Sequence, residues 1–149
     1  MHHQLIRHGQ GSRTWSIVLD AGDEVNTCLQ DFARREVLSA TRFTAIGTLH
    51  DAVLGYFESE KQSYRRDALD QPTQIVSLVG DIALHNGRPR IHIRAVLGNG
   101  DGSTVDARLL EGRVKSTMEI VMTEAPVRLH KDYDADAGLA LFKHGGSAA

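Results

Sequence analysis

The chain has 149 residues, of which 41% are hydrophobic and 24% charged, and its formal net charge is −2 at pH 7. These values predict one globular domain with its own core and argue against a disordered chain. They also argue against general affinity for nucleic acid, which a clear excess of basic residues would favour.

Cysteine content and hydropathy indicate the compartment. The lone Cys28 excludes an intramolecular disulfide and a thiolate metal cluster, as is typical of the reducing cytoplasm. No window reaches the roughly 18 consecutive apolar residues of a membrane span, and the first residues lack the apolar run of a secretory signal. We therefore expect a cytoplasmic protein with no membrane partner. Residues 1–13 should form a flexible N-terminus, residues 14–143 a single domain, and residues 144–149 a flexible C-terminus.

The chain should begin with a short strand and an amphipathic helix. The run TWSIVLD at 14–20 has the β-branched and aromatic content of a strand. Asp23 is the expected N-cap of the helix, and Arg34 and Arg35 fall where the helix dipole favours cations. The apolar residues of this helix recur at helical spacing on one stripe: Val25, Cys28, Leu29, Phe32 and Ala33.

From residue 42 onward the sequence predicts strands. Segment 42–59 indicates two strands or one bent ribbon, with Gly47 and Gly55 marking bends. Segment 60–72 is polar, and we expect an exposed connection there. Further strands are expected at 74–84, at 90–97, on both sides of Gly112, and as a short strand or turn at 139–142.

One early helix followed by many strands predicts an α+β domain. We expect a mainly antiparallel sheet of about six to seven strands with one main amphipathic helix. Such a sheet has two faces, and one helix covers only part of one of them. Self-association would cover the remainder.

Four motifs, in this order, resemble the PPC domain family (plants and prokaryotes conserved), a domain of unknown function. They are GDEVNTCLQDFARRE, FTAIGTLHDAVLGYF, IVSLVGDIALHNGRPRIHIRAVLGNGDG and LLEGRVKSTMEIVMTE. The resemblance implies an antiparallel sheet with a flanking helix, assembled as a homotrimer. It also implies two associations with DNA: plant members carry the domain beside AT-hook segments, and bacterial and archaeal members are often labelled DNA-binding.

Family members commonly place His-x-His on one strand of the central hairpin and Gly-Gly-His on the next, which can form a divalent-metal site. In this chain the two segments read His92-Ile93-Arg94 and Asp106-Ala107-Arg108. A guanidinium has no lone pair to donate and repels a cation. His92 and Asp106 then supply at most two ligands, so we predict no metal here and no cofactor.

The same hairpin carries the candidate ligand site, formed by His92, Arg94, Asp106 and Arg108. Alternation along a strand places each pair on one face. With the turn centred on Gly100, His92 would face Arg108 and Arg94 would face Asp106. The surplus positive charge suits a small anion such as a carboxylate or a phosphate. The alternative is a cross-strand ion pair or a bridge between subunits.

The sequence therefore predicts a homotrimer that binds a small anion or a protein partner, with no catalytic residue assigned. One alternative is a DNA-associated regulatory protein. Its support is the family label and the segment GRPR at 87–90, which resembles the core of an AT-hook but also has ordinary turn chemistry. The other alternative is a hydrolase or lyase with His92 as base and Arg94 and Arg108 as anion clamps.

Overall fold

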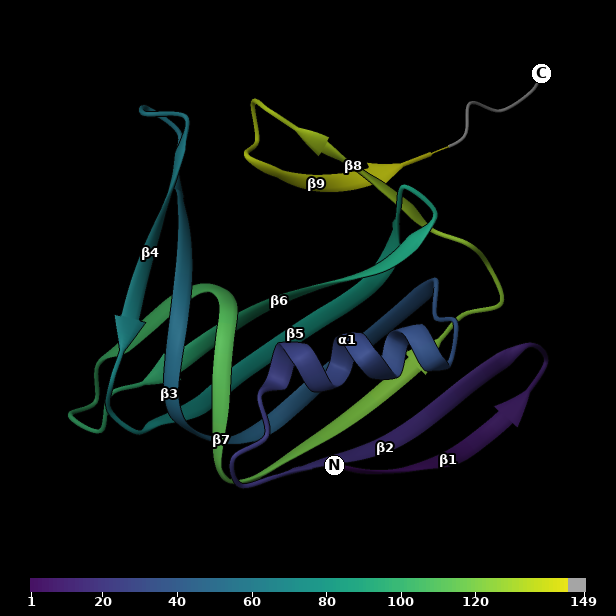
Figure 1. The fold of residues 1–149 in the computed structure, drawn as a ribbon, viewed down its shortest axis with the longest axis horizontal. Coiled ribbons are helices and arrows are strands. Elements are labelled where there is room, and N and C mark those ends of the chain that lie inside the picture. Colours follow the sequence, from purple (N-terminus) through teal and green to yellow (C-terminus); the bar gives the residue numbers. More distant parts are fainter. Residues whose placement is uncertain (145–149) are drawn as a thin grey trace.

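The computed structural model describes residues 1–144, which form nine β-strands and one α-helix (Figure 1). The helix is α1 (Val25–Arg35). The strands are β1 (His2–Gly9), β2 (Ser12–Asp20), β3 (Ala40–Glu58), β4 (Ser63–Leu69), β5 (Thr73–His85), β6 (Arg88–Gly98), β7 (Thr104–Glu124), β8 (His130–Asp134) and β9 (Leu139–Lys143). Among residues 1–144, no helix has the length and apolar character needed to cross a membrane.

The prediction of an α+β domain with six to seven strands was wrong. Over the described residues the protein is mostly β: nine strands join one sheet, and α1 spans only 11 residues. Three strands were missed, and for a common reason. All eight residues of β1 are exposed, and β4 and β8 are also largely exposed. Strands without a buried face lack the apolar alternation by which a sequence reveals a strand.

Two segments that were expected to be flexible or to form an exposed connection contain strands. β1 lies within residues 1–13, which were expected to be flexible, and it pairs antiparallel with β2. β4 lies within segment 60–72, which was expected to be a connection, and pairs antiparallel with β3. At 139–142, where a short strand or turn was expected, the structure has the strand β9. The predicted flexible C-terminus falls at residues 145–149, outside the described residues, apart from residue 144.

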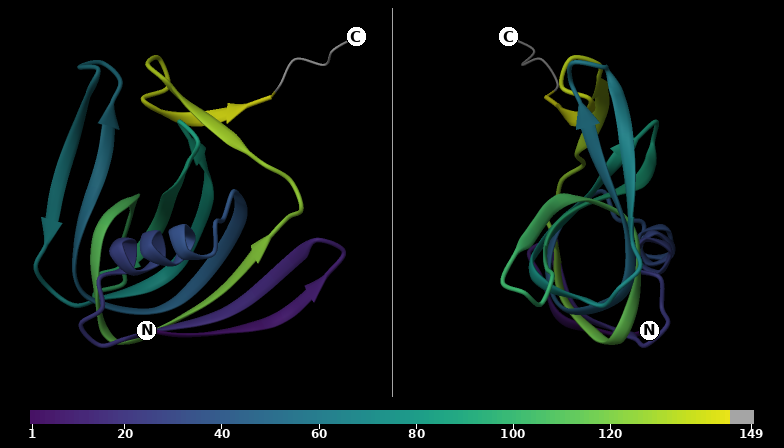
Figure 2. Two further views of the ribbon diagram at one scale, coloured as in Figure 1. Left: turned by 45° about the vertical axis from the view of Figure 1, so that its right-hand side comes forward. Right: turned by 90° about the vertical axis from the view of Figure 1, so that its left-hand side faces the viewer.

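The two longest strands, β3 and β7, pair with each other and close the sheet into a ring. β3 pairs with β5 and β7, β5 with β6, and β6 with β7, so these four strands form a closed circuit (Figure 2, right). β3 bends at Gly47, where the pairing register shifts and φ is 150°. A Cβ at this position would lie 2.6 Å from the Thr117 carbonyl oxygen, so the bend requires glycine.

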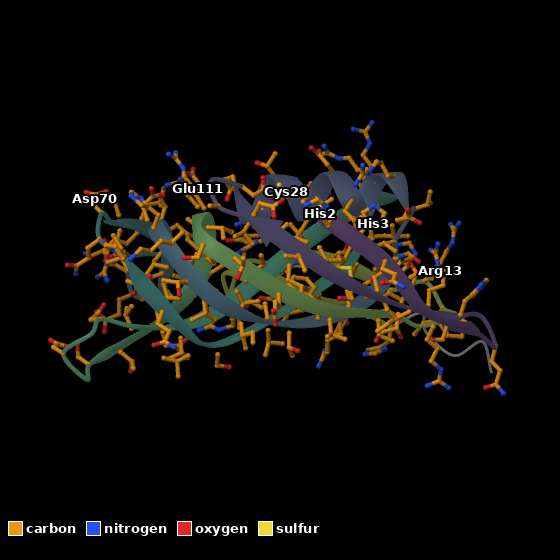
Figure 3. The ribbon with its side chains drawn as sticks, turned by 90° about the horizontal axis from the view of Figure 1, so that it is seen from below. His2, His3, Arg13, Cys28, Asp70 and Glu111 are labelled. Atoms are coloured by element: carbon orange, nitrogen blue, oxygen red, sulfur yellow. The ribbon has the colours of Figure 1, made fainter. Side chains whose placement is uncertain are left out.

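The helix packs as its sequence pattern predicted. Val25, Leu29, Phe32 and Ala33 are buried, and α1 lies alongside the strand ring (Figures 1 and 2). One side chain of β1 also contacts the helix: the centroid of the His3 ring lies 5.0 Å from that of the Phe32 ring, and Figure 3 shows His3 near α1. The stripe is therefore the face that joins the helix to the core.

The predicted N-cap was wrong by one residue. Glu24, not Asp23, caps α1: its carboxylate accepts hydrogen bonds from the backbone N–H groups of Asn26 and Thr27. Glu24 also accepts one from the backbone N–H of Gly112 on β7, at 2.9 Å. The longer side chain can therefore cap the helix and tie it to the sheet at once.

Two hairpins project from the same end of the molecule (Figure 1). The β3–β4 hairpin extends the ring, and the β8–β9 hairpin folds back toward it. β8 joins the sheet through one parallel backbone pair, Leu84 with His130. The hairpins meet where Gly138 packs on Phe57, since a Cβ at Gly138 would overlap that ring. The candidate site lies between these two hairpins and strands β5, β6 and β7.

Candidate functional site

A cavity of about 550 Å³ lies between the two projecting hairpins and the face of β5, β6 and β7. This volume is in the range of small-molecule sites. Its polar lining includes side chains from five strands and from the β3–β4 turn: Ser59, Tyr64, Asp81, His92, Arg94, Arg108 and Lys131. Each hairpin closes one side of the cavity, so the site depends on segments far apart in the sequence.

Three of the four predicted residues line this cavity. His92 and Arg94 come from β6 and Arg108 from β7. Asp106 lies beside them and forms an ion pair with Arg94, with 3.3 Å between Arg94 Nη2 and Asp106 Oδ1. The structure therefore brings the four side chains to one face of the hairpin.

The predicted centre of this hairpin's turn was wrong by one residue, which shifts the pairing register by two residues. The turn is centred on Asp101 rather than Gly100, because Gly98 pairs with Thr104. As a result Arg94 lies directly opposite Arg108, and the contact between Arg94 and Asp106 is diagonal. Sequence alone could not place the turn, since two glycines flank Asp101 and either supports a tight turn.

The opposed arginines give the site its electrostatic character. Like charges directly opposite each other on adjacent strands repel. Arg94 is partly neutralised by Asp106, but both side chains are more than 60% exposed, which makes the ion pair weak. Within residues 1–144, Arg108 has no carboxylate partner and donates to the phenol oxygen of Tyr64 at 3.2 Å. A guanidinium with unused donors therefore faces the cavity.

Asp81 and Lys131 were not predicted as site residues. Lys131 Nζ lies 2.6 Å from Asp81 Oδ1, and the Lys131 side chain is 9% exposed. Burial opposes ionisation of Asp81, but contacts with His92 and Lys131 outweigh it and hold the pKa of Asp81 below its ordinary value. Asp81 is therefore a carboxylate shared by two basic groups.

A signal for Asp81 was present in the sequence. The Asn-Gly turn at 86–87 joins β5 to β6 and fixes their register, which pairs Asp81 with His92. No such signal existed for Lys131. β8 reaches the site through the tertiary fold, and no periodic pattern marks its short exposed sequence.

The two nitrogens of His92 have different environments. Nδ1 is buried and lies 3.6 Å from Asp81 Oδ1, beyond hydrogen-bond length, so the contact is electrostatic. The side chain as a whole is 21% exposed and lines the cavity. Of the two ring nitrogens, Nδ1 is buried without a partner and Nε2 is not, so Nε2 is the nitrogen that a ligand can reach.

These residues do not fit a divalent metal. Arg94 and Arg108 stand where the family resemblance implied imidazoles, and guanidinium groups cannot coordinate a cation. Within residues 1–144, no three His, Cys, Asp or Glu side chains gather closely enough to hold a metal ion. The chemistry of the donor set favours an anion instead.

The GRPR segment at 87–90 is part of a rigid turn. Asn86 and Gly87 form the two-residue connection, both with positive φ. Gln30 of α1 donates to the carbonyl oxygen of Pro89 at 2.8 Å and accepts from the N–H of Ile91 at 3.3 Å. The segment is therefore built into the β5–β6 hairpin, unlike an AT-hook, which lies in an extended, flexible stretch.

Comparison with known proteins agrees with the fold and the motifs. The family model described as "Plants and Prokaryotes Conserved (PCC) domain" matches residues 6–126. No curated protein matches the chain.

Solved structures extend the comparison. A plant- and prokaryote-conserved (PPC) protein from Pyrococcus horikoshii is 28% identical, with a TM-score of 0.80 over 96% of this chain and 95% of that one. A "putative dna binding protein" from Bacteroides thetaiotaomicron is 20% identical, with a TM-score of 0.82 over 95% and 96%. A metal-containing protein from Archaeoglobus fulgidus is 24% identical, with a TM-score of 0.79 over 96% and 97%. Since the family model spans most of the chain, this protein belongs to the Plants and Prokaryotes Conserved (PCC) domain family.

Proposed function

We propose that this protein binds a small anionic molecule in the cavity between its two projecting hairpins. The observation that carries this proposal is the direct opposition of Arg94 and Arg108 at the cavity wall. Two guanidinium groups at one site repel each other, and an anion between them would relieve the repulsion and take up their free donors. A planar, forked donor suits a carboxylate or a phosphate.

The test is a thermal-shift and calorimetry screen of the wild-type protein with carboxylates and inorganic phosphate. Arg108→Gln should lower the affinity for any anion that binds by more than about tenfold, because a charge-assisted bidentate contact is lost. Arg113→Gln is the matched control, since Arg113 lies on the same strand, is 61% exposed and does not line the cavity. Equal affinities for the two variants would reject the site.

We also propose that the protein acts as a homotrimer in the cytoplasm. Support for assembly comes from apolar side chains on the outer face of the sheet: Ile46, Val79 and Val121 are 63%, 45% and 54% exposed. Val79 also lines the cavity, so association through this face would bring a neighbouring subunit close to the site. Sedimentation velocity should give three times the chain mass, and a monomer at micromolar concentration would reject assembly. The lone Cys28 supports the compartment.

An enzymatic function has one specific observation in its favour. Asp81 lies beside Nδ1 of His92, as in sites where a carboxylate orients a histidine base. A hydrolase or lyase would then use Arg94 and Arg108 to hold an anionic substrate. A screen of ester, phosphoester and hydroxy-acid substrates, with His92→Ala as control, tests this function. Turnover that His92→Ala leaves unchanged would exclude it.

DNA binding is less well supported by this chain. The Bacteroides thetaiotaomicron neighbour carries a DNA-binding description, but the net charge here is −2, and the arginines at the cavity are too few to follow a phosphate backbone. A gel-shift titration at low salt should show no complex. A complex whose affinity falls steeply with added salt would favour the DNA-associated alternative instead.

A further inference from the structure

The ligand class of the cavity follows from how its charges balance. Arg94 forms an ion pair with Asp106 and Lys131 with Asp81, whereas Arg108 has no carboxylate partner among residues 1–144. One positive charge remains while the His92 ring is neutral. A carboxylate carries one negative charge and matches the guanidinium fork, so it balances the site without excess.

His92 supplies a second polar contact. The neutral ring carries one proton, and the Asp81 carboxylate beside Nδ1 favours that proton on Nδ1. Nε2 is then a hydrogen-bond acceptor that a ligand can reach. His92 and Arg94 lie on the same face of β6 and both line the cavity, so a ligand whose carboxylate binds the arginines can extend its adjacent carbon toward His92. A hydroxyl group on that carbon would donate to Nε2.

The part of the cavity lining next to Arg108 is apolar and aromatic. Tyr56, Phe57 and Tyr64 of the β3–β4 hairpin form it, together with Leu139 of β9. The Phe57 and Tyr64 rings contact each other, with their centroids 5.8 Å apart. These side chains can bury the hydrocarbon part of a ligand, which a simple inorganic anion lacks.

From these three features we infer that the cavity takes a 2-hydroxy carboxylate with an apolar, preferably aromatic, substituent. The carboxylate binds Arg108 and Arg94, the hydroxyl donates to His92, and the ring packs on the β3–β4 hairpin. This inference rests on the proposed anion-binding function and adds the chemical class of the ligand.

Calorimetry at pH 8 with four matched compounds tests the inference. 3-Phenyllactate, as each enantiomer, has all three features. 3-Phenylpropanoate lacks the hydroxyl, 3-phenylpropane-1,2-diol lacks the carboxylate, and lactate lacks the ring. We expect one enantiomer of 3-phenyllactate to bind about fivefold or more tighter than 3-phenylpropanoate, the value of one hydrogen bond. Lactate and the diol should each bind at least about tenfold more weakly.

Two variants locate the hydroxyl contact. In His92→Ala the preference for 3-phenyllactate over 3-phenylpropanoate should fall to about one, while 3-phenylpropanoate binding persists. His50→Ala is the matched control, because His50 also faces an aspartate, at 3.0 Å from Asp51, but lies outside the cavity. It should leave the preference unchanged. A preference that His92→Ala also leaves unchanged would overturn the role of His92.

The wild-type comparison decides the inference even if a variant fails to fold. Equal binding of 3-phenyllactate and 3-phenylpropanoate would overturn the ligand class, as would Arg108-dependent binding of inorganic phosphate without any carboxylate. Both results would leave anion binding intact. Failure of every anion, phosphate included, would instead reject the proposed function itself.

Discussion

The ion pair between Lys131 and Asp81 holds the β8–β9 hairpin against the rest of the sheet. The two charged atoms are 2.6 Å apart, and the side chains are 9% and 23% exposed. β8 is also attached to β5 by one backbone pairing at Leu84 and by a hydrogen bond from His85 Nδ1 to the carbonyl oxygen of Lys131, at 3.0 Å. Replacing the lysine by methionine keeps most of the side-chain volume and removes the charge. Lys131→Met therefore tests whether a single buried ion pair secures the hairpin.

The expected cost follows from the burial of the pair. Removing one partner of a fully buried ion pair costs about 3–5 kcal/mol, because the other charge is left uncompensated. Asp81 is about one-quarter exposed and keeps its contact with His92, so we expect about 2–3 kcal/mol. For a chain of this size that corresponds to a fall of about 4–12 °C in the unfolding temperature. The double variant Asp81→Asn/Lys131→Met leaves no buried charge and should recover part of the loss.

The same hairpin offers a matched control. Lys143 pairs with Asp132 at 2.9 Å, but the two side chains are 69% and 57% exposed. Lys143→Met should therefore change the free energy of unfolding by less than about 1 kcal/mol. Urea denaturation followed by circular dichroism measures both variants, and limited proteolysis reports release of the hairpin. Equal losses for Lys131→Met and Lys143→Met would refute the argument that burial makes this pair important.

Three further predictions concern other contacts. The pKa of Asp81 is lowered in the folded protein. Its ion pair with Lys131 therefore stabilises the fold at pH values above the ordinary carboxyl pKa of about 3.9. This stabilisation is lost as the pH falls through the lower pKa of the folded state. The stability gap between wild type and Asp81→Asn should therefore shrink between pH 6 and pH 3 in urea titrations, and a gap that widens would contradict this sign. Gly80→Ala should cost about 1–3 kcal/mol or more, because its Cβ would overlap the buried Phe43 ring; an unchanged urea midpoint would count against this packing. Glu24→Ala should cost about 1–2 kcal/mol by removing the helix cap and its link to β7, whereas Glu24→Gln, measured in the same way, should retain most of the stability.

The sequence predicted the elements whose side chains divide between core and solvent. The helical stripe that includes Leu29 and Phe32 was confirmed because α1 buries one face and exposes the other. β1 and β4 were missed because their stability comes from backbone pairing to β2 and β3, which leaves no trace in the side chains. Pattern analysis detects burial, so it cannot detect an edge strand whose residues are all exposed.

For the candidate site, the sequence predicted which residues of one strand share a face, but not how the strands pair with each other. Two-residue alternation placed His92 with Arg94 and Asp106 with Arg108, and the structure keeps those pairs on one face. The register across the hairpin depended on which residue of a glycine-rich turn lies at its centre, and hydrophobicity does not encode that choice. Lys131 could not be predicted as a site residue, because it lies on β8, which only tertiary packing brings to the site.

The electrostatics of the hairpin favour a binding role over a purely structural one. A pair of strands built for stability would place opposite charges across the ladder, yet Arg94 faces Arg108. The available compensation is weak: an exposed aspartate for one arginine and a neutral phenol for the other. The same two side chains face a cavity with an aromatic wall. Because an anion there would remove the repulsion, the arrangement that is unfavourable in the free protein becomes favourable in the complex, as expected where stability is given up for binding.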